Sequence, residues 1–184
     1  MKVILAGYNY DMQFGDKVRT PETLSASYAR ISRSEKPINE LRRDACSQVK
    51  KARKSNETII FGLGHASVAE HAVFNFDIIN ISRLATEFVQ HHRLASFTEK
   101  SQRYVKFKNA YHIPAELKSN AKLLSEYKAF CNSCFSLYNE IVSKCSSEGL
   151  DRTTVNEDAR YVLPLSTLTQ FGMTLNAREL EHMI

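Results

Sequence analysis

The sequence contains no tryptophan, only four cysteines and no apolar run of about 18 residues. Without such a run, we expect no membrane-spanning helix. The N-terminal stretch MKVILAGYNYDMQFGD has no small-residue cleavage site and soon turns polar, so it predicts a strand and not a signal peptide. Without an export signal, we expect a cytoplasmic protein whose cysteines stay reduced.

Length and composition favour one globular domain with a substantial core. The chain has 184 residues, of which 43% are hydrophobic and 24% are charged. The formal net charge is +5, which suits an anionic partner without identifying it. Nucleic acid, a phosphate-bearing metabolite and a solvated surface all stay open at this point.

Hydrophobic periodicity predicts an α+β protein with long helices around a mixed or antiparallel sheet. Capping boxes are expected at Ser67 with Glu70 and at Thr154 with Glu157. Strands are expected at 2–8 and 72–82, and a loop is expected at 94–105. Helices are expected at 22–32, 39–54, 83–92, 119–148, about 154–164 and from 165 to the end, and Gly149 is expected to cap the helix at 119–148.

Two groups of metal-ligand residue types lack the spacing that a metal site needs. Cys131 and Cys134 form a CxxC pair, but they lie inside an expected long helix, so core thiols are favoured over zinc or redox chemistry. His65 and His71 are six residues apart, which does not place them on one helical face with Glu70. We therefore expect no metal, and interpret these polar groups beside a glycine-rich turn as cofactor contacts.

The predicted helix at 39–54 is strongly basic, with cations at Arg42, Arg43, Lys50, Lys51, Arg53 and Lys54. Such a helix can bind nucleic acid. It contains no aromatic residue for base stacking, so a solvated face is the favoured interpretation.

The segment 91–103 concentrates hydrogen-bond donors and charges within a short stretch. Arginine forks suit phosphates and planar carbonyl groups, and hydroxyls with backbone amides complete phosphate cradles. The pattern predicts a site for a phosphate-bearing ligand, with a surface loop as the alternative. Near the end, Arg160, Asn176, Arg178 and His182 form a second polar group, and Arg178 and His182 share a helical face.

Residues 91–104 also carry a resemblance to a known family. His91-His92-Arg93 is followed by LASFTEK and then by Ser101-Gln102-Arg103-Tyr104. This order is similar to the signature of flavin-dependent thymidylate synthases, which is arginine-histidine-arginine, seven residues, serine, any residue, arginine and tyrosine. Further similar blocks occur in the family's order, namely YARIS at 28–32, GHASVAEH at 64–71, NISR at 80–83 and ARYVLPLSTLTQFGMTLNAREL at 159–180.

The resemblance implies an activity, a fold and an assembly. The family converts deoxyuridine monophosphate (dUMP) to deoxythymidine monophosphate, with methylenetetrahydrofolate as carbon donor, reduced flavin adenine dinucleotide (FAD) as hydride donor and NADPH as the reductant of the flavin. The implied fold is that of the thymidylate synthase complementing proteins, as one domain over residues 1–184 without the family's C-terminal end. The implied assembly is a homotetramer with active sites at subunit junctions.

The resemblance also implies which residues hold which ligand. Those expected to contact dUMP are Glu99, Ser101, Arg103 and Arg160, and the last three of these are the expected catalytic residues. Those expected around the flavin are Ser32, His65, Ser67, Glu70, His91, His92, Arg93, Leu94, Thr98, Glu99, Asn176, Arg178 and His182.

The sequence departs from the family pattern in three places. His91 replaces the first signature arginine, and Phe88 stands where the family usually has a glutamine that contacts the nucleotide. The chain ends at Ile184, before the family's next arginine. Two alternatives therefore stay open: a catalytically impaired flavin- and nucleotide-binding module of a tandem or hetero-oligomeric relative, and a nucleic-acid-binding protein that uses the basic helix.

Overall fold

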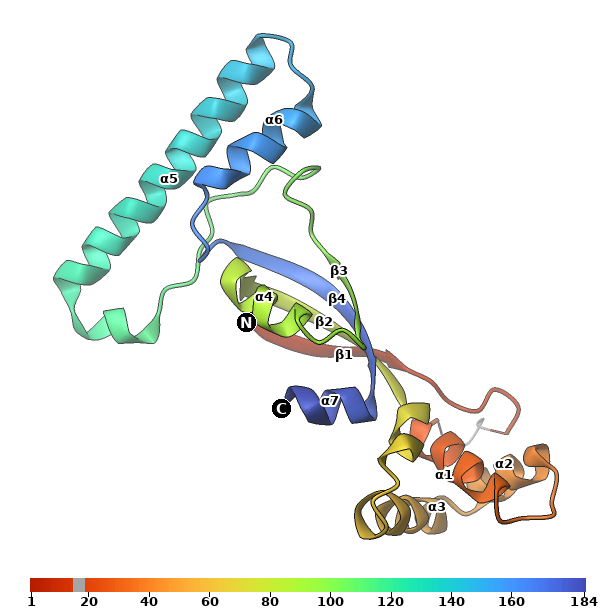
Figure 1. Cartoon of the computed structure of the whole chain (residues 1–184). Coiled ribbons are helices and arrows are strands. Elements are labelled where there is room, and N and C mark those ends of the chain that lie inside the picture. The colour runs from red at the N-terminus through yellow and green to blue at the C-terminus, as the bar shows by residue number, and fades with distance from the viewer. Residues whose placement is uncertain (15–18) are drawn as a thin grey trace. The chain divides into compact units, whose positions relative to one another are not determined.

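The computed structural model describes residues 1–14 and 19–184, and a four-stranded sheet runs through them (Figure 1). The strands are β1 (Lys2–Tyr8), β2 (Val73–Ser82), β3 (Ser96–Glu99) and β4 (Leu168–Asn176), in the order β1-β2-β4-β3. Backbone hydrogen bonds join the end of one strand to the start of its neighbour, as from Asn9 to Val73 and from Lys100 to Gln170. Neighbouring strands are therefore antiparallel. With the helices, this arrangement confirms the α+β prediction.

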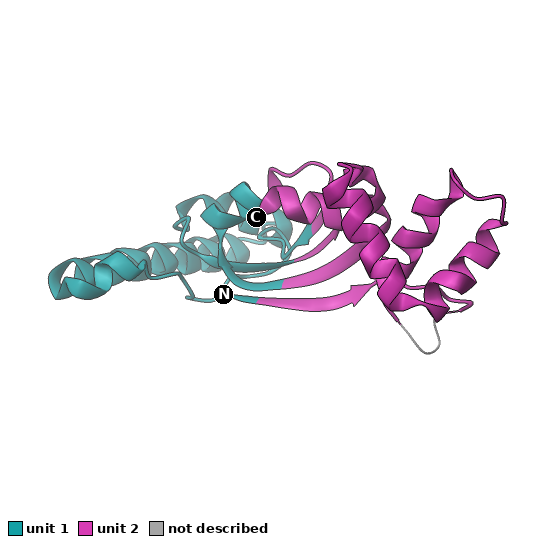
Figure 2. Cartoon of the chain, turned by 90° about the horizontal axis from the view of Figure 1, so that it is seen from below, with its two compact units in different colours: residues 1–2, 78–89, 98–171 teal, residues 3–77, 90–97, 172–184 magenta. Residues whose placement is uncertain are grey.

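The chain forms two compact units, which Figure 2 colours separately. Unit 1 contains residues 1–2, 78–89 and 98–171, and unit 2 contains residues 3–77, 90–97 and 172–184. Neither unit is a continuous stretch, because β2 and β4 contribute residues to both. The expectation of one domain over residues 1–184 stays a prediction.

Unit 1 is built around a helical hairpin of α5 (Ala121–Ser147) and α6 (Arg152–Ala159). Tyr138 and Val142 of α5 are buried against Val155 and Ala159 of α6. Gly149 joins the helices with φ at 79°, a conformation that favours glycine, so its predicted capping role is confirmed. The other helices of this unit are α4 (Arg83–Gln90, except its last residue), η3 (Ala115–Ser119) and η4 (Arg160–Val162).

Unit 2 packs three helices through small side chains. Ala26, Ala45 and Ala52 form a buried cluster, one from each of α1 (Pro21–Ile31), α2 (Ile38–Ser47) and α3 (Val49–Asn56). Alanine at these contacts lets helices approach closely. The unit also contains η1 (Glu57–Gly62), η2 (Ala66–His71) and α7 (Ala177–Met183).

Several predicted boundaries were wrong for local reasons. The basic helix is two helices, because Gln48 leaves helical geometry with φ −126° and ψ 57°. Its predicted turn at residues 55–56 is instead helical, and α3 continues into the π-helix η1. The expected loop at 94–105 contains β3.

Neither predicted capping box forms. The short helix η2 begins after His65 without a side-chain cap, so Ser67 lies inside it. Asp151, not Thr154, caps α6 by accepting the backbone amide of Thr154.

The C-terminal region was predicted as one helix, but it is a strand followed by a helix. Residues 168–176 form β4, with Thr169, Phe171, Met173 and Leu175 buried at every second position. That spacing is the period of a strand with one buried face. The helix begins only at Ala177, where the side chain of Asn176 accepts the backbone amide of Glu179.

Among the described residues, no helix is both long enough and apolar enough to cross a membrane.

Candidate functional site

The second half of the signature lies in unit 1, where β3 ends. Glu99 is the last residue of β3, and its two carboxylate oxygens have different partners. Arg83 Nη1 donates to Glu99 Oε2 at 2.8 Å, and the hydroxyl of Thr169 donates to Oε1 at 3.0 Å. Because Thr169 is buried in β4, this pairing fixes the side chain of Glu99 at the edge of the sheet.

Arg83 is an important residue that the sequence analysis did not select. It is the first residue of α4, and the same guanidinium that binds Glu99 also donates to Thr86 Oγ1 at 2.5 Å and pairs with Glu87. Thr86 is fully buried, so the guanidinium is anchored on its inner side. The only signal in the sequence was the NISR block, which was noted but not assigned a role.

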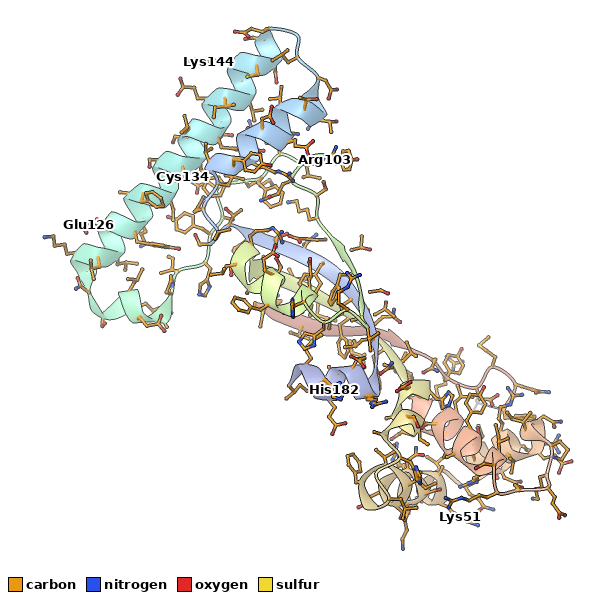
Figure 3. All side chains as sticks on the ribbon, in the orientation of Figure 1. Lys51, Arg103, Glu126, Cys134, Lys144 and His182 are labelled. Carbon is orange, nitrogen blue, oxygen red and sulfur yellow. The ribbon has the colours of Figure 1, made fainter. Side chains whose placement is uncertain are left out.

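Ser101, Arg103 and Arg160 come together through Glu157. Arg103 Nε lies 3.0 Å from Glu157 Oε2, and Arg160 Nη2 lies 3.5 Å from Oε1 of the same carboxylate. The hydroxyl of Ser101 accepts the backbone amide of Arg103 at 3.1 Å, which closes a turn. Figure 3 labels Arg103 among the side chains of this unit. Glu157 was not among the predicted site residues.

A cavity of about 240 Å³ opens between these residues within unit 1. Its lining is Arg83, Glu99, Lys100, Ser101, Gln102 and Arg160. Three cations face one carboxylate there, so the cavity favours an anion. It therefore contains three of the four residues expected to contact dUMP, and Arg103 borders it through Ser101 and Glu157.

A second cavity of unit 1, of about 320 Å³, shares residues with the first. Arg83, Gln102 and Arg160 line both cavities. The rest of the lining adds an aromatic ring and aliphatic side chains to one carboxylate: Glu87, Tyr161, Leu163, Pro164 and Leu165. A charged pocket thus continues into a more apolar one, a combination that suits a phosphate attached to a ring.

In unit 2, a cavity of about 460 Å³ contains several residues that were expected around the flavin. Ser67 and Glu70 come from η2, and Asn176 comes from the end of β4. Two aromatic residues complete the wall, since the rings of Tyr28 and His71 meet edge to face with centroids 4.7 Å apart. Both rings lie in blocks that the resemblance used, but neither had been assigned a role.

Arg178 and Glu70 join two distant parts of the sequence at this cavity. Arg178 Nη1 donates to Glu70 Oε1 at 2.5 Å, which links α7 to η2. The backbone supports the same arrangement, because Ala177 N donates to Ala72 O at 2.8 Å. The buried Nε of Arg178 has no hydrogen-bond partner among the described residues. An unpaired buried donor is costly, so the Glu70 pairing is what holds this guanidinium beside the cavity.

The remaining predicted flavin residues are not in the lining of this cavity. His91 to Leu94 form a turn after α4, in which the amide of Ala95 bonds His92 O at 3.3 Å, and the side chain of Leu94 is 75% exposed. Four further predicted flavin residues are exposed on other elements: Ser32 at the end of α1, His65 before η2, Thr98 in β3 and His182 in α7. His182 Nδ1 lies 3.9 Å from Glu179 Oε1.

The structure also shows where the cysteines and the other side chains that can bind metals lie. All four cysteines are free, with Cys131 buried and Cys134 half-buried in α5. Burial raises the pKa of the Cys134 thiol, which makes it less reactive than an exposed thiol. No group of three or more histidine, cysteine, aspartate or glutamate side chains in the described part of the chain is placed to hold a metal ion.

Sheet order and cavities together define an α+β protein with an anion-favouring site beside β3. Comparison with known families identifies it more closely, because residues 15–184 match the model of the thymidylate synthase complementing proteins. The chain therefore belongs to this family.

Relatives of the chain carry the name flavin-dependent thymidylate synthase. The chain is 36% identical over 128 residues to a flavin-dependent thymidylate synthase of Pyrococcus furiosus, which covers 67% of this chain and 49% of the relative. It is 35% identical over 169 residues to the flavin-dependent thymidylate synthase of Geobacter sulfurreducens, covering 88% of this chain and 66% of the relative. In several such matches the aligned part is about half of the relative's length.

One solved structure shares the fold. It is PolB, a UMP/dUMP methylase from Streptomyces cacaoi with 5-Br dUMP bound, and it matches with a TM-score of 0.71. The match covers 98% of this chain and 75% of PolB at 19% sequence identity. At this identity the likeness shows a common fold.

Proposed function

We propose that the chain is a subunit of a flavin-dependent thymidylate synthase, which methylates dUMP with methylenetetrahydrofolate as carbon donor and NADPH as reductant. Family membership and the names of the relatives support this proposal. The observation that carries it is the unit 1 cavity, where Arg83, Lys100 and Arg160 surround a signature serine next to a fixed carboxylate. Such a lining suits a nucleotide monophosphate.

Each dUMP residue has a role that follows from its chemistry. Arg103 and Arg160 offer guanidinium forks, which bind phosphate or a planar carbonyl through paired hydrogen bonds. The same cations stabilise negative charge that grows on the uracil carbonyls during the reaction. Ser101 contributes a hydroxyl for phosphate, and Glu99, held by Arg83 and Thr169, accepts a hydrogen bond from the base or the sugar.

The unit 2 cavity has the residue types that a flavin nucleotide needs. The Ser67 hydroxyl and the Asn176 amide can bond a ribose or a ring carbonyl, and the rings of Tyr28 and His71 offer flat surfaces. Arg178, which pairs with Glu70 of the lining, is a further flavin contact in this proposal. When bound, reduced FAD supplies the hydride. In this proposal Ser32, His65, Glu70, His91, His92, Arg93, Leu94, Thr98, Glu99 and His182 remain flavin contacts of the assembled protein.

The assembly and the location belong to the same proposal. We expect a homotetramer in which neighbouring subunits complete each site, since many predicted flavin residues, such as Leu94, are exposed in the single chain. We expect it in the cytoplasm, where four free thiols stay reduced.

Tritium release from 5-tritiated dUMP, with methylenetetrahydrofolate and NADPH present, tests the activity. We expect a yellow protein with flavin absorbance and release that depends on both co-substrates. In Arg160→Ala we expect release to fall about a hundredfold, because a charge aimed at the substrate is lost. The matched control is Arg152→Ala on the exposed start of α6, which leaves release unchanged. A colourless protein that takes up no added FAD would overturn the proposal.

A second function, that of a flavin- and nucleotide-binding module without synthase activity, is favoured by His91 and Phe88. Both depart from the family pattern, and the Phe88 side chain is 71% exposed on α4, where the family has a polar contact. A chain that binds FAD and dUMP but releases no tritium would be a binding module of a larger assembly. If the chain is such a module, we expect the family residues restored by His91→Arg and Phe88→Gln to raise tritium release. An active synthase releases tritium without these two changes.

A further inference from the structure

Most cations of the basic stretch are exposed, as a solvated face requires, and two of them, Lys51 and Lys54, also line a cavity of unit 2. The cavity has a volume of about 350 Å³ and lies between the end of α1 and the end of α3. Its lining is Arg30, Arg33, Lys51, Lys54, Ser55, Thr58, Ile59 and Leu63. We call it the basic cavity; none of the predicted flavin or dUMP residues lines it.

Within the described residues, no carboxylate forms an ion pair with the cations of the basic cavity, although Asp44 interacts electrostatically with one of them, Arg30. Its lining holds four cations and no carboxylate. None of these four side chains forms an ion pair within residues 1–14 and 19–184, whereas Arg53, also on α3, pairs with Glu22 at 3.1 Å. The nearby carboxylate of Asp44 is bound to Lys36 at 2.7 Å. Four like charges around one hollow repel each other, so a bound anion relieves an existing cost.

The backbone around the basic cavity is unusual. After α3 the chain enters the π-helix η1, in which Leu63 N bonds Thr58 O at 3.0 Å. π-helical turns are rare and occur frequently at functional sites. Here the π-helix contributes Thr58 and Ile59 to the lining, so the cavity has one apolar side beside its cations. Figure 3 labels Lys51 on α3.

We propose that the basic cavity binds clustered phosphoryl groups of a small ligand, of the class of a phosphorylated dinucleotide. A phosphomonoester carries about −1.5 to −2 charges at pH 7, and two bridging phosphates add about −2, which balances four cations. The volume lies at the lower end of the range for small-ligand sites, enough for the phosphates and part of a sugar or ring. Ile59 and Leu63 supply the apolar contact for that part.

Calorimetric titration with inorganic pyrophosphate tests the cavity. The test variant is Lys51→Gln with Lys54→Gln, two exposed positions three residues apart on one face of α3. The matched control is Lys50→Gln, which removes an exposed charge from the same helix outside the lining. Glutamine keeps helix propensity close to that of lysine, and circular dichroism checks the fold. We expect at least about tenfold weaker pyrophosphate binding in the double variant and no change in the control.

Competition experiments identify the source of the phosphates. NADPH that displaces pyrophosphate better than NADH supports a dinucleotide with an additional phosphate, and displacement by neither supports a free polyphosphate as the occupant. The proposal is overturned by a wild-type protein that does not bind pyrophosphate, or by equal loss in the Lys50→Gln control. Single-stranded oligonucleotide binding that exceeds pyrophosphate binding and depends on Lys51 and Lys54 would also overturn it. The probe contains neither flavin nor uracil, so the result does not depend on the proposed synthase activity.

Discussion

At the scale of single residues, Glu157 pairs with two arginines beside the unit 1 cavity. Its carboxylate binds both Arg103 and Arg160, and these are the two arginines that we assign to dUMP. A phosphate ligand therefore competes with an internal carboxylate for the same guanidinium groups. The three side chains are partly exposed, so each ion pair contributes about 1 kcal/mol or less.

We predict that Glu157→Gln tightens dUMP binding by about two- to fivefold, because the ligand no longer displaces a carboxylate. Titration calorimetry against wild type measures the change. Glu148→Gln, at the exposed end of α5, is the control and leaves the affinity unchanged. If the Glu157→Gln variant binds dUMP more than about tenfold more weakly than wild type, Glu157 positions the arginines and does not compete with the ligand.

The positions of the site residues show which of them could be predicted from the sequence. Glu99, Ser101 and Arg160 were predicted from their blocks and line one cavity. Arg83, Gln102 and Glu157 were missed. Their roles depend on pairings such as Arg83 with Glu99, 16 residues apart, and Arg103 with Glu157, 54 residues apart, which only the folded chain brings together.

At the scale of elements, α6 depends on a cap whose charge titrates. The Thr154 amide donates to Asp151 Oδ2 at 3.0 Å, and this hydrogen bond holds the pKa of the Asp151 carboxyl below its ordinary value of 3.8. A carboxyl with a lowered folded-state pKa adds stability that is fully present above the unfolded pKa. This stability is lost as the pH falls through the folded pKa.

We predict that the melting temperature of the wild type decreases more steeply below about pH 4 than that of Asp151→Asn. Asparagine keeps the capping hydrogen bond but carries no titrating charge. Thermal melts followed by circular dichroism between about pH 3 and 6 compare the two proteins. Parallel curves for both proteins over this range would show that the cap contributes no acid-dependent stability.

The α5–α6 hairpin is held by a compact apolar contact. Val155 is 4% exposed and packs with Tyr138, Val142 and Ala159. We predict that Val155→Ala lowers the free energy of unfolding by about 2 kcal/mol, through lost apolar burial and a residual cavity. Urea denaturation measures the loss. Val105→Ala, where the side chain is 40% exposed, serves as the control and stays within about 0.5 kcal/mol of wild type.

Among the elements, β1, α1, β2, α4 and α5 were predicted to within about two residues, and the C-terminal strand was not. Strong single patterns mark the first group, such as the alternation in β2 and the long helical period of α5. In β4 the buried positions 169, 171, 173 and 175 also alternate, but leucine and methionine suit a helix equally well. The helical spacing of Arg178 and His182 belongs to α7 alone, which begins at Ala177.

At the scale of the whole molecule, the unit 1 site and the basic cavity of unit 2 differ in how their cationic residues are paired. In unit 1, Arg83 pairs with Glu87 and Glu99, while Arg103 and Arg160 pair with Glu157. In unit 2, the four cations of the basic cavity have no ion-pair partner within the described residues. The arginines of the first set have internal carboxylate partners, whereas the second set has none within the described residues.

We predict that the two sites respond differently to ionic strength. Pyrophosphate affinity for the basic cavity should fall steeply between about 0.05 and 0.3 M salt, because unpaired charges are fully exposed to screening. The affinity of dUMP for unit 1 should change less over the same range. Calorimetric titrations at several salt concentrations measure both slopes in one preparation. Equal slopes would show that internal pairing has no effect on ligand binding.

The carboxylate between Arg103 and Arg160 also gives the unit 1 site the character of an ion exchanger. A phosphate that enters replaces one anion with another, and the released Glu157 carboxylate is then free to take a new partner. Binding at this site is thus a substitution reaction whose leaving group remains tethered to the protein. Departure of a bound phosphate is assisted by the return of the same carboxylate, so the residue that weakens binding also shortens the time for which the site stays occupied.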